Sequence, residues 1–227
     1  MILLIFSISS SPIVVKAESS TRYAKETINI RAKPNTKSKI VGKLYWNDKV
    51  QIIKKVSKKW YMIRYKKKKR YVCASFLKNR KSKYKVCSSP SKNTFKSYED
   101  ANCITDSTKL AQGRLKRGYH LDYHSGVWMV GNRYCIAVGS YYTKRIGVKI
   151  DLVLSPKSGR KHTLKCITAD CKSDRDTVNM HRIHKDGSVV EFIVKTKYLS
   201  KRTKLTGDIS CAGKKFKGKI KEIRVYK

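Results

Sequence analysis

The chain has 227 residues, of which 54 are Lys or Arg and 15 are Asp or Glu, so its formal net charge is +39. Its hydrophobic content of 40%, with 10% aromatic residues, excludes a chain that is disordered throughout, and its length allows one or two domains. A positive charge of this size favours a polyanionic partner, either nucleic acid, an anionic membrane or the anionic polymers of a bacterial wall.

The first 17 residues are predicted to be a secretory signal peptide. The run MILLIFSISSSPIVV is apolar, and Ala17 follows it where a signal peptidase would cleave. The charged segment that normally opens such a signal is missing, so the true start can lie upstream of Met1. Pro12 and the serines make the run too short and broken for a membrane span, and a buried N-terminal strand is the alternative. We expect a secreted or cell-wall-associated protein with no membrane span.

Residues 20–78 are predicted to be a first unit of short alternating strands. The strand segments read INIRA, IVGKLY, KVQII, WYMIRY and RYVCASFL. Pro34-Asn35, Asn47-Asp48 and the lysine run 66–69 supply the turns. A lysine run is usually a solvated hairpin tip, but against a polyanionic wall it also adds long-range attraction.

The pattern of this unit resembles a bacterial SH3 domain. It is carried by Thr27-x-Asn29-x-Arg31-x-x-Pro34, by Ile40-x-Gly42-x-Leu44, and by Val50, Trp60-Tyr61, Tyr71-Val72 and Phe76-Leu77. The resemblance implies a small barrel that docks on peptidoglycan or its cross-bridge peptides. The candidate wall-binding residues are Asn29, Arg31, Trp60, Tyr61 and Tyr71. Core packing is the alternative role for Trp60 and Tyr71, because aromatic side chains bury large apolar areas.

Residues 79–102 are polar, rich in Ser and Lys and without periodicity, so they are predicted to be a linker. Residues 103–227 form the second unit. Its tail, KFKGKIKEIRVYK, alternates apolar and basic residues and predicts a final strand with one solvated face. One helical turn is expected in KYLSKRTKL. Because no long amphipathic helix is present, the predicted class is all-β.

The stretch Tyr134–Val194 carries the chemistry that we expect in the second unit. Three apolar, β-branched runs, YCIAVGSYYTKRIGVKIDLVL, LKCITAD and DGSVVEFIV, predict strands. Asp151, Asp170 and Glu191 lie at or near the strand ends. Carboxylates are scarce in this chain, so a site is predicted here.

The same stretch resembles the three-aspartate domain of wall-remodelling proteins and the wider double-psi barrel group of murein lytic transglycosylases. This resemblance implies a six-stranded β-barrel. Asp170 matches the second aspartate of that pattern, Glu191 falls where the third lies, and Gly139 stands near the first. The implied activity is that of a peptidoglycan lytic transglycosylase or glycan hydrolase.

Asp170, with Glu191 beside it, is therefore the candidate proton donor of a glycan-cleaving site. Burial would keep one carboxyl protonated, and a lytic transglycosylase needs a single acid because the sugar's own hydroxyl replaces water as nucleophile. Alternatively, Asp170 caps a turn and Glu191 faces solvent, and the protein is a non-catalytic binder of anionic wall polymers or another polyanion.

Other chemistries have weaker patterns in this sequence. Cys166-x4-Cys171 with His181-x2-His184 departs from the usual zinc spacing, and a thiol hydrolase would need Cys135 or Cys171 to meet His120 or His124. Seven cysteines leave at least one without an intramolecular partner, and buried free thiols are expected at Cys73, Cys135 and Cys166. No base-stacking or helix-turn-helix pattern supports nucleic acid as the main partner. We predict no metal and no cofactor, and we expect peptidoglycan and anionic wall polymers as partners.

Overall fold

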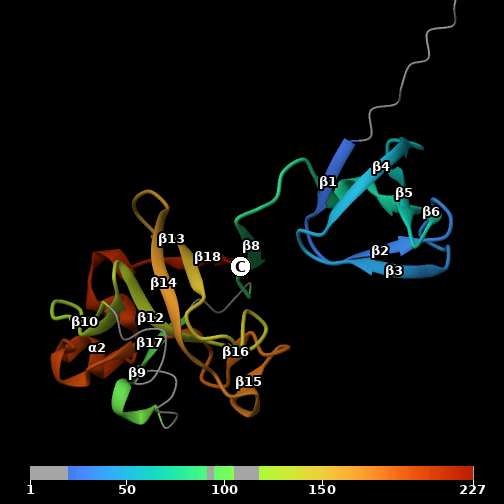
Figure 1. The fold of residues 1–227 in the computed structure, drawn as a ribbon. Helices are drawn as coiled ribbons and strands as arrows, with labels where there is room; N and C mark the ends of the chain where they lie inside the picture. Colours follow the sequence, from blue (N-terminus) through green and yellow to red (C-terminus); the bar gives the residue numbers. More distant parts are fainter. Residues whose placement is uncertain (1–19, 91–94, 105–117, 227) are drawn as a thin grey trace, which may run out of the picture. The chain divides into compact units, whose positions relative to one another are not determined.

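The computed structural model describes residues 20–90, 95–104 and 118–226, which divide after Ser82 into two compact units (Figure 1). Strands dominate both units, which confirms the all-β prediction. The predicted signal peptide lies outside the described residues. In the described part of the chain, no helix has the length and apolar character needed to cross a membrane.

The first unit is a seven-stranded antiparallel sheet with the order β3-β2-β6-β5-β4-β1-β7. Its strands are β1 (Ser20–Ala24), β2 (Ile28–Arg31), β3 (Ile40–Leu44), β4 (Lys49–Lys55), β5 (Trp60–Tyr65), β6 (Lys68–Cys73) and β7 (Leu77–Lys78). Strands β2 to β6 match the predicted segments, whereas β1, which lies between β4 and β7, is a strand that the sequence pattern did not indicate. The inward residues of these strands, among them Ile30, Ile63 and Val72, form one apolar core.

The lysine run forms a tight hairpin between β5 and β6, as predicted. Tyr65 pairs with Lys68, so the loop consists of Lys66 and Lys67 alone. Both loop residues have positive φ angles, 48° and 62°. Two successive positive φ angles are the geometry of a type I′ turn, which Asn-Gly adopts more easily than two lysines do.

The second unit contains a nine-stranded mixed sheet. Eight strands follow the order β10-β11-β17-β12-β14-β13-β18-β8, and β9 pairs with β17. Their bounds are β8 (Tyr84–Ser88), β9 (Phe95–Asp100), β10 (Tyr119–Asp122), β11 (Val127–Val130), β12 (Arg133–Val138), β13 (Lys149–Ser155), β14 (His162–Cys171), β17 (Ser188–Val194) and β18 (Lys219–Tyr226). A small hairpin of β15 (Thr177–Val178) and β16 (Ile183–His184) and a short helix, α2 (Lys201–Thr206), complete the unit. The helix lies where a helical turn was predicted.

The linker predicted at residues 79–102 is wrong for most of its length. Strand β8 pairs antiparallel with β18, and β9 pairs parallel with β17, so both belong to the second sheet. The sheet therefore holds nine strands, more than the six expected, and the double-psi class of the barrel stays a prediction. The parallel pairs β9–β17 and β12–β14 join segments that are distant in sequence, which explains why a local pattern did not reveal β9.

Side chains of β12 alternate between two apolar clusters, one on each face of the sheet. Ile136 and Val138 belong to the larger cluster, while Cys135 and Ala137 belong to the smaller one. Cys135 and Cys166 are fully buried free thiols, as expected, whereas Cys73 is only partly buried.

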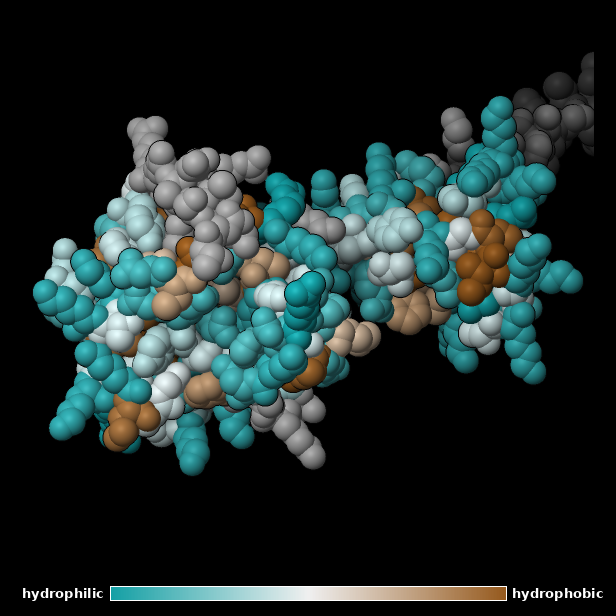
Figure 2. Space-filling view, turned by 90° about the horizontal axis from the view of Figure 1, so that it is seen from below, coloured by the Kyte–Doolittle hydropathy of each residue, from teal (hydrophilic) through white to brown (hydrophobic). Residues whose placement is uncertain are grey.

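The visible surface of both units is mostly hydrophilic, with small scattered apolar patches (Figure 2). The most exposed large apolar side chains include Leu205, Met180 and Tyr123 of the second unit and Tyr45 of the first. Lysines at this density keep the surface polar.

Candidate functional site

Asp170 and Glu191 meet across strand β12. Ala137 pairs with Asp170 of β14 on one side and with Glu191 of β17 on the other. Residues at matched register positions point to the same face of a sheet, so the two carboxylates share one face. Both line a polar pocket of about 340 Å³. The structure thus brings together the two residues that the sequence predicted as a pair.

A third carboxylate, Glu99 of β9, lines the same pocket. Ser97, two residues before Glu99 on β9, pairs with Glu191. Glu99 therefore lies on the same face of the sheet as Glu191. Burial raises the pKa of the Glu99 carboxyl above its ordinary 4.5, and the negative charges of Glu191 and Asp170 raise it further. Sequence reasoning missed Glu99 because it falls in the segment taken for a linker, where only Phe95 and Tyr98 hinted at a strand.

The ammonium group of Lys172 neutralises part of the negative charge of this acidic cluster. Its side chain is 1% exposed, and its Nζ donates to Glu191 Oε1 at 3.0 Å and to Ser188 Oγ at 2.6 Å. Burial lowers the pKa of Lys172, although the charge of Glu191 opposes the shift. Lys172 therefore acts mainly on Glu191, whereas Asp170 Oδ1 accepts a hydrogen bond from the backbone N–H of Cys171 at 2.7 Å.

The close contact between Lys172 and Ser188 has the composition of a serine–lysine nucleophile pair. Ser188, however, has no exposed surface, so no substrate carbonyl can reach its hydroxyl. The charge of Glu191 also favours the charged form of the ammonium. The contact is therefore structural, and it fixes the start of β17 against the end of β14.

His184, Asp186 and Glu191 place three potential metal-ligand atoms within 4.8 Å of one another. His184 Nδ1 lies 3.1 Å from Asp186 Oδ1 and 3.9 Å from Glu191 Oε1. Because the Lys172 ammonium already contacts the same Glu191 oxygen, a cation there would meet a competing positive charge. Neither Cys166 nor Cys171 belongs to this described group, so the weak zinc pattern is not assembled as the sequence suggested.

Gly139 shows why the first aspartate of the three-aspartate pattern has no counterpart. A Cβ atom at this position would lie 2.0 Å from the backbone oxygen of His181, between β15 and β16. No side chain fits there unless that loop moves. The pocket therefore combines the second and third positions of the pattern, Asp170 of β14 and Glu191 of β17, with Glu99 of β9.

Two other predicted candidates have structural roles. Asp151 is buried, with Arg133 Nη1 at 2.8 Å and the Tyr226 hydroxyl donating to it at 2.7 Å, which anchors β18 on β13. Burial raises the pKa of the Cys135 thiol to about 12, so this cysteine stays protonated and is a poor nucleophile.

The predicted wall-binding residues of the first unit divide between the two faces of its sheet. Arg31 pairs with Tyr71, and Asn29 lies two residues before Arg31, so these three share the outer face. Tyr61 pairs with the fully buried Val72 and packs against the core. Trp60 is only 9% exposed. Trp60 and Tyr61 therefore contribute mainly to packing.

The first unit also has a shallow groove of about 980 Å³ along β4 and β5. Ile52, Ile53 and Tyr65 supply apolar lining, and the hairpin residues Lys66 and Lys67 lie at its end. None of the five predicted wall-binding residues lines this groove. Its mixture of apolar and cationic groups suits a ligand that carries both apolar and anionic parts.

A comparison with curated proteins gave no match. A comparison with protein-family models gave a match over residues 26–78, which span β2 to β7 of the first unit. The family is described as the bacterial SH3 domain. The resemblance predicted from the sequence is thereby confirmed, and the first unit carries a bacterial SH3 domain.

Proposed function

We propose that the protein is secreted, binds the bacterial cell wall through its SH3 domain, and acts on glycan strands at the pocket of Glu99, Asp170 and Glu191. The presence of a bacterial SH3 domain is consistent with a cell-wall-binding module and a wall-associated protein. The observation that carries the catalytic part is that Glu99, Asp170 and Glu191 line one pocket, with the pKa of Glu99 raised.

The three carboxylates have different neighbours, which assigns them different roles in the proposal. Glu191 accepts a hydrogen bond from the Lys172 ammonium, so in the proposal it supplies negative charge and not a proton. Burial and the acidic neighbours raise the pKa of Glu99, so in the proposal it is the acid that donates a proton to a glycosidic oxygen. Asp170, the donor expected from the sequence, is then the base that accepts the proton of the attacking sugar hydroxyl or water. If Asp170 is the donor, the two roles exchange.

Purified peptidoglycan, incubated with the full chain, tests this assignment. We expect soluble fragments from the wild type, and a loss of about two to four orders of magnitude in rate for Glu99→Gln, the usual weight of general acid catalysis. Asp170→Asn tests the proposed role of Asp170 as the base. Asp176→Asn is the matched control, because Asp176 lines the same pocket but is more than half exposed. Anhydro-sugar ends would indicate a transglycosylase, and reducing ends a hydrolase.

A non-catalytic binder is the second candidate, and the net charge of +39 favours it. A wild type that releases no fragment from any wall preparation, yet is retained by those walls, would support this reading. N-terminal sequencing of exported protein tests the secretion part separately, with a mature start near Glu18 as the expected result.

A further inference from the structure

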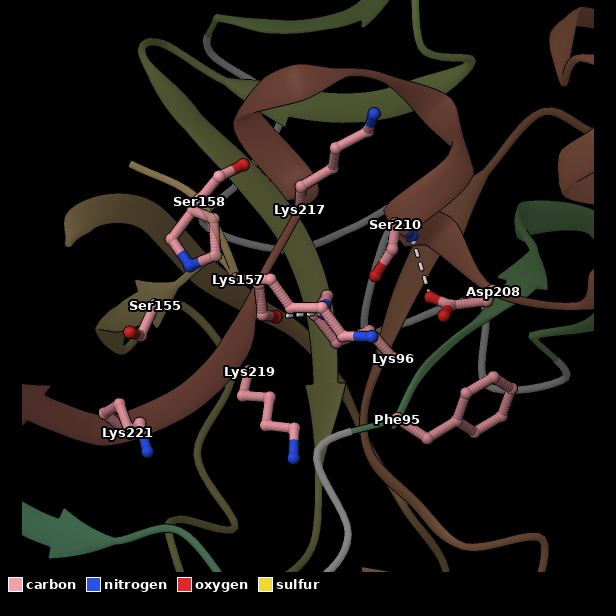
Figure 3. Close-up of a pocket in the computed structure, with 12 residues that line it drawn as sticks. Phe95, Lys96, Ser155, Lys157, Ser158, Asp208, Ser210, Lys217, Lys219 and Lys221 are labelled. Atoms are coloured by element: carbon pink, nitrogen blue, oxygen red, sulfur yellow. Dashed lines mark hydrogen bonds between the residues drawn. The ribbon is translucent and has the colours of Figure 1, made fainter. Parts of the chain in front are cut away.

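The second unit has a larger cavity that the proposed catalytic pocket does not use. Its volume is about 780 Å³, and five lysines and three serines line it against a single carboxylate, Asp208 (Figure 3). The lining residues come from the start of β9, the turn after β13, the segment around residue 210 and the start of β18. Distant parts of the chain therefore converge to place positive charge around one hollow.

Lys96 is the innermost of these lysines. Its side chain is 2% exposed, and its Nζ donates to the backbone oxygen of Gly218 at 2.8 Å (Figure 3). Burial lowers the pKa of Lys96, although the charge of Asp208 opposes the shift. An ammonium has three hydrogen atoms to donate, so this bond leaves donor capacity at the edge of the cavity.

The backbone beside Lys96 is held in a fixed shape. Gly218 has a φ angle of +113°, and a Cβ there would lie 2.6 Å from the backbone nitrogen of Pro156. Only glycine lets the start of β18 approach the turn after β13 this closely. Asp208 is also engaged, because it accepts from the backbone N–H of Ser210 at 2.8 Å. The cavity is thus a built feature and not a chance gap between mobile side chains.

Four further lysines, Lys157, Lys217, Lys219 and Lys221, surround the cavity and are exposed. Like charges gathered around a concave surface repel one another and focus a positive potential into it, and a bound anion relieves that repulsion. Serine hydroxyls from the same lining can donate to anion oxygens. A phosphate group fits this set because it offers several acceptor oxygens at high charge density.

We propose that this cavity binds phosphate groups, and that the ligand is a phosphodiester polymer of the kind that makes bacterial walls anionic. The polymer part rests on the proposed wall-associated function, whereas phosphate binding does not. The four exposed lysines suit a ligand with successive phosphates, because neighbouring phosphates can contact different lysines of the rim while the buried Lys96 adds positive charge behind them. A free phosphate compound is the other source of the same chemistry.

Calorimetric titration of the full chain, at physiological salt, tests the proposal with pyrophosphate and with a poly(glycerol phosphate) oligomer. Lys219→Gln/Lys221→Gln should weaken the binding of both probes about tenfold, because two exposed charge pairs with the ligand are lost. Lys201→Gln/Lys204→Gln removes the same charge from exposed positions on α2, outside the cavity, and should change either affinity less than about twofold.

Equal losses in the two variants would overturn the proposal, because binding would then follow net charge alone. Pyrophosphate binding that depends on the cavity, without polymer binding, would establish the phosphate site and overturn the polymer. Tighter, cavity-dependent binding of a single-stranded oligonucleotide would assign the site to nucleic acid instead. Lys96→Met tests the innermost group, with circular dichroism as the control for folding. Fragment release from peptidoglycan should be unchanged in all these variants, so failure here is distinguishable from failure of the catalytic proposal.

Discussion

The two units use charge in different ways. Between residues 21 and 80 the chain has 20 basic residues and two acidic ones, and among the described residues every buried polar or charged side chain lies in the second unit. The SH3 domain therefore folds around an apolar core, with its lysines left in solvent. The second unit instead places charges inside its structure, at Lys96, Lys172 and Asp151.

This difference indicates which charges a unit needs in order to fold. Exposed lysines contribute little to stability, so those of the SH3 domain remain available for long-range attraction to a polyanion. Buried charges are costly unless they are paired, so those of the second unit are placed by specific partners. The charge of the first unit can be altered with little effect on its fold, whereas the charges of the second are part of its fold.

Removing Glu191, the partner of Lys172, should have the largest effect on stability. Glu191→Leu leaves a buried ammonium without its carboxylate, and we expect the second unit to lose about 3–5 kcal/mol of unfolding free energy. Lys172→Met/Glu191→Leu should recover most of the loss, because the pair is then replaced by apolar groups. Urea unfolding followed by segment-resolved hydrogen exchange reports each unit separately.

Asp48→Asn is the control in the first unit. Asp48 Oδ2 accepts from the backbone N–H of Tyr45 in a surface turn, and an Asn oxygen can accept in its place. We expect a change of less than about 1 kcal/mol. An equally large effect in both units would contradict the view that only the second depends on placed charges.

Gly139→Ala should give the next largest effect. The added methyl would meet the backbone oxygen of His181, so the β15–β16 hairpin must move, at a cost of about 1–3 kcal/mol. Gly131→Asn is the control, because nothing lies within 4 Å of a Cβ there and asparagine tolerates its positive φ. Thermal unfolding measures both. A neutral Gly139→Ala would reopen this position to the aspartate of the three-aspartate pattern.

The pH dependence of stability should show opposite signs at two carboxylates of the second unit. The native pKa of Glu99 is raised, so the native state holds its proton more tightly, and stability is lost as pH rises from about 4.5 through the raised value. Glu99→Gln removes this loss, and the variant should gain stability relative to wild type as pH rises. Urea unfolding at pH 4 and at pH 7 measures the trend.

Asp122 provides the comparison for Glu99. Burial raises its pKa, but hydrogen bonds from Lys215 and Ser125 outweigh burial and bring the pKa down to about 2. Its contribution to stability is therefore present above about pH 3.8 and lost as the pH falls toward 2. Asp122→Asn should be less stable than wild type near neutral pH, with the difference shrinking in acid. Parallel trends in the two variants would contradict the assigned neighbours.

Strands of the SH3 domain could be predicted because the pairs β2–β3, β4–β5 and β5–β6 are consecutive and antiparallel, so each of these hairpins shows its own alternation and turn residues. The second sheet could be predicted for its apolar strands β12, β13, β14 and β17 and for the alternating tail that forms β18. Strands β8 and β9 are polar in sequence and gain their place from partners far along the chain. Tertiary pairing decided their structure, as it often does for strands.

Tertiary pairing also explains which residues of the candidate site could be predicted from the sequence and which could not. Asp170 and Glu191 follow recognisable apolar strands, so their pairing was predictable, and the register through Ala137 brings them together. Glu99 could not be predicted because its strand was not recognised. Lys172 lies two residues after Asp170 in sequence, yet its side chain contacts Glu191, and this contact depends on the packing beyond the end of β14.

Changes in the hairpin of Lys66 and Lys67 should have the smallest effect on stability and binding. In this turn, exposed charge coincides with backbone strain. Both residues adopt positive φ angles, which lysine disfavours by about 1 kcal/mol or more relative to Asn or Gly. If stability alone decided this turn, Asn-Gly would fit it better. Their charge is therefore the feature to test, and both lysines lie at the end of the groove along β4 and β5.

Lys66→Asn/Lys67→Gly should stabilise the SH3 domain by about 1 kcal/mol, because the turn is relieved of strain. The same variant should bind purified walls about threefold more weakly at low salt, with the difference fading at high salt, since the lost charges are exposed and screened. Lys54→Gln/Lys55→Gln removes equal charge from exposed positions of β4 that do not line the groove. An equal loss of wall binding in both variants would mean that the hairpin lysines act through net charge, and the strained turn would then have no role in wall binding.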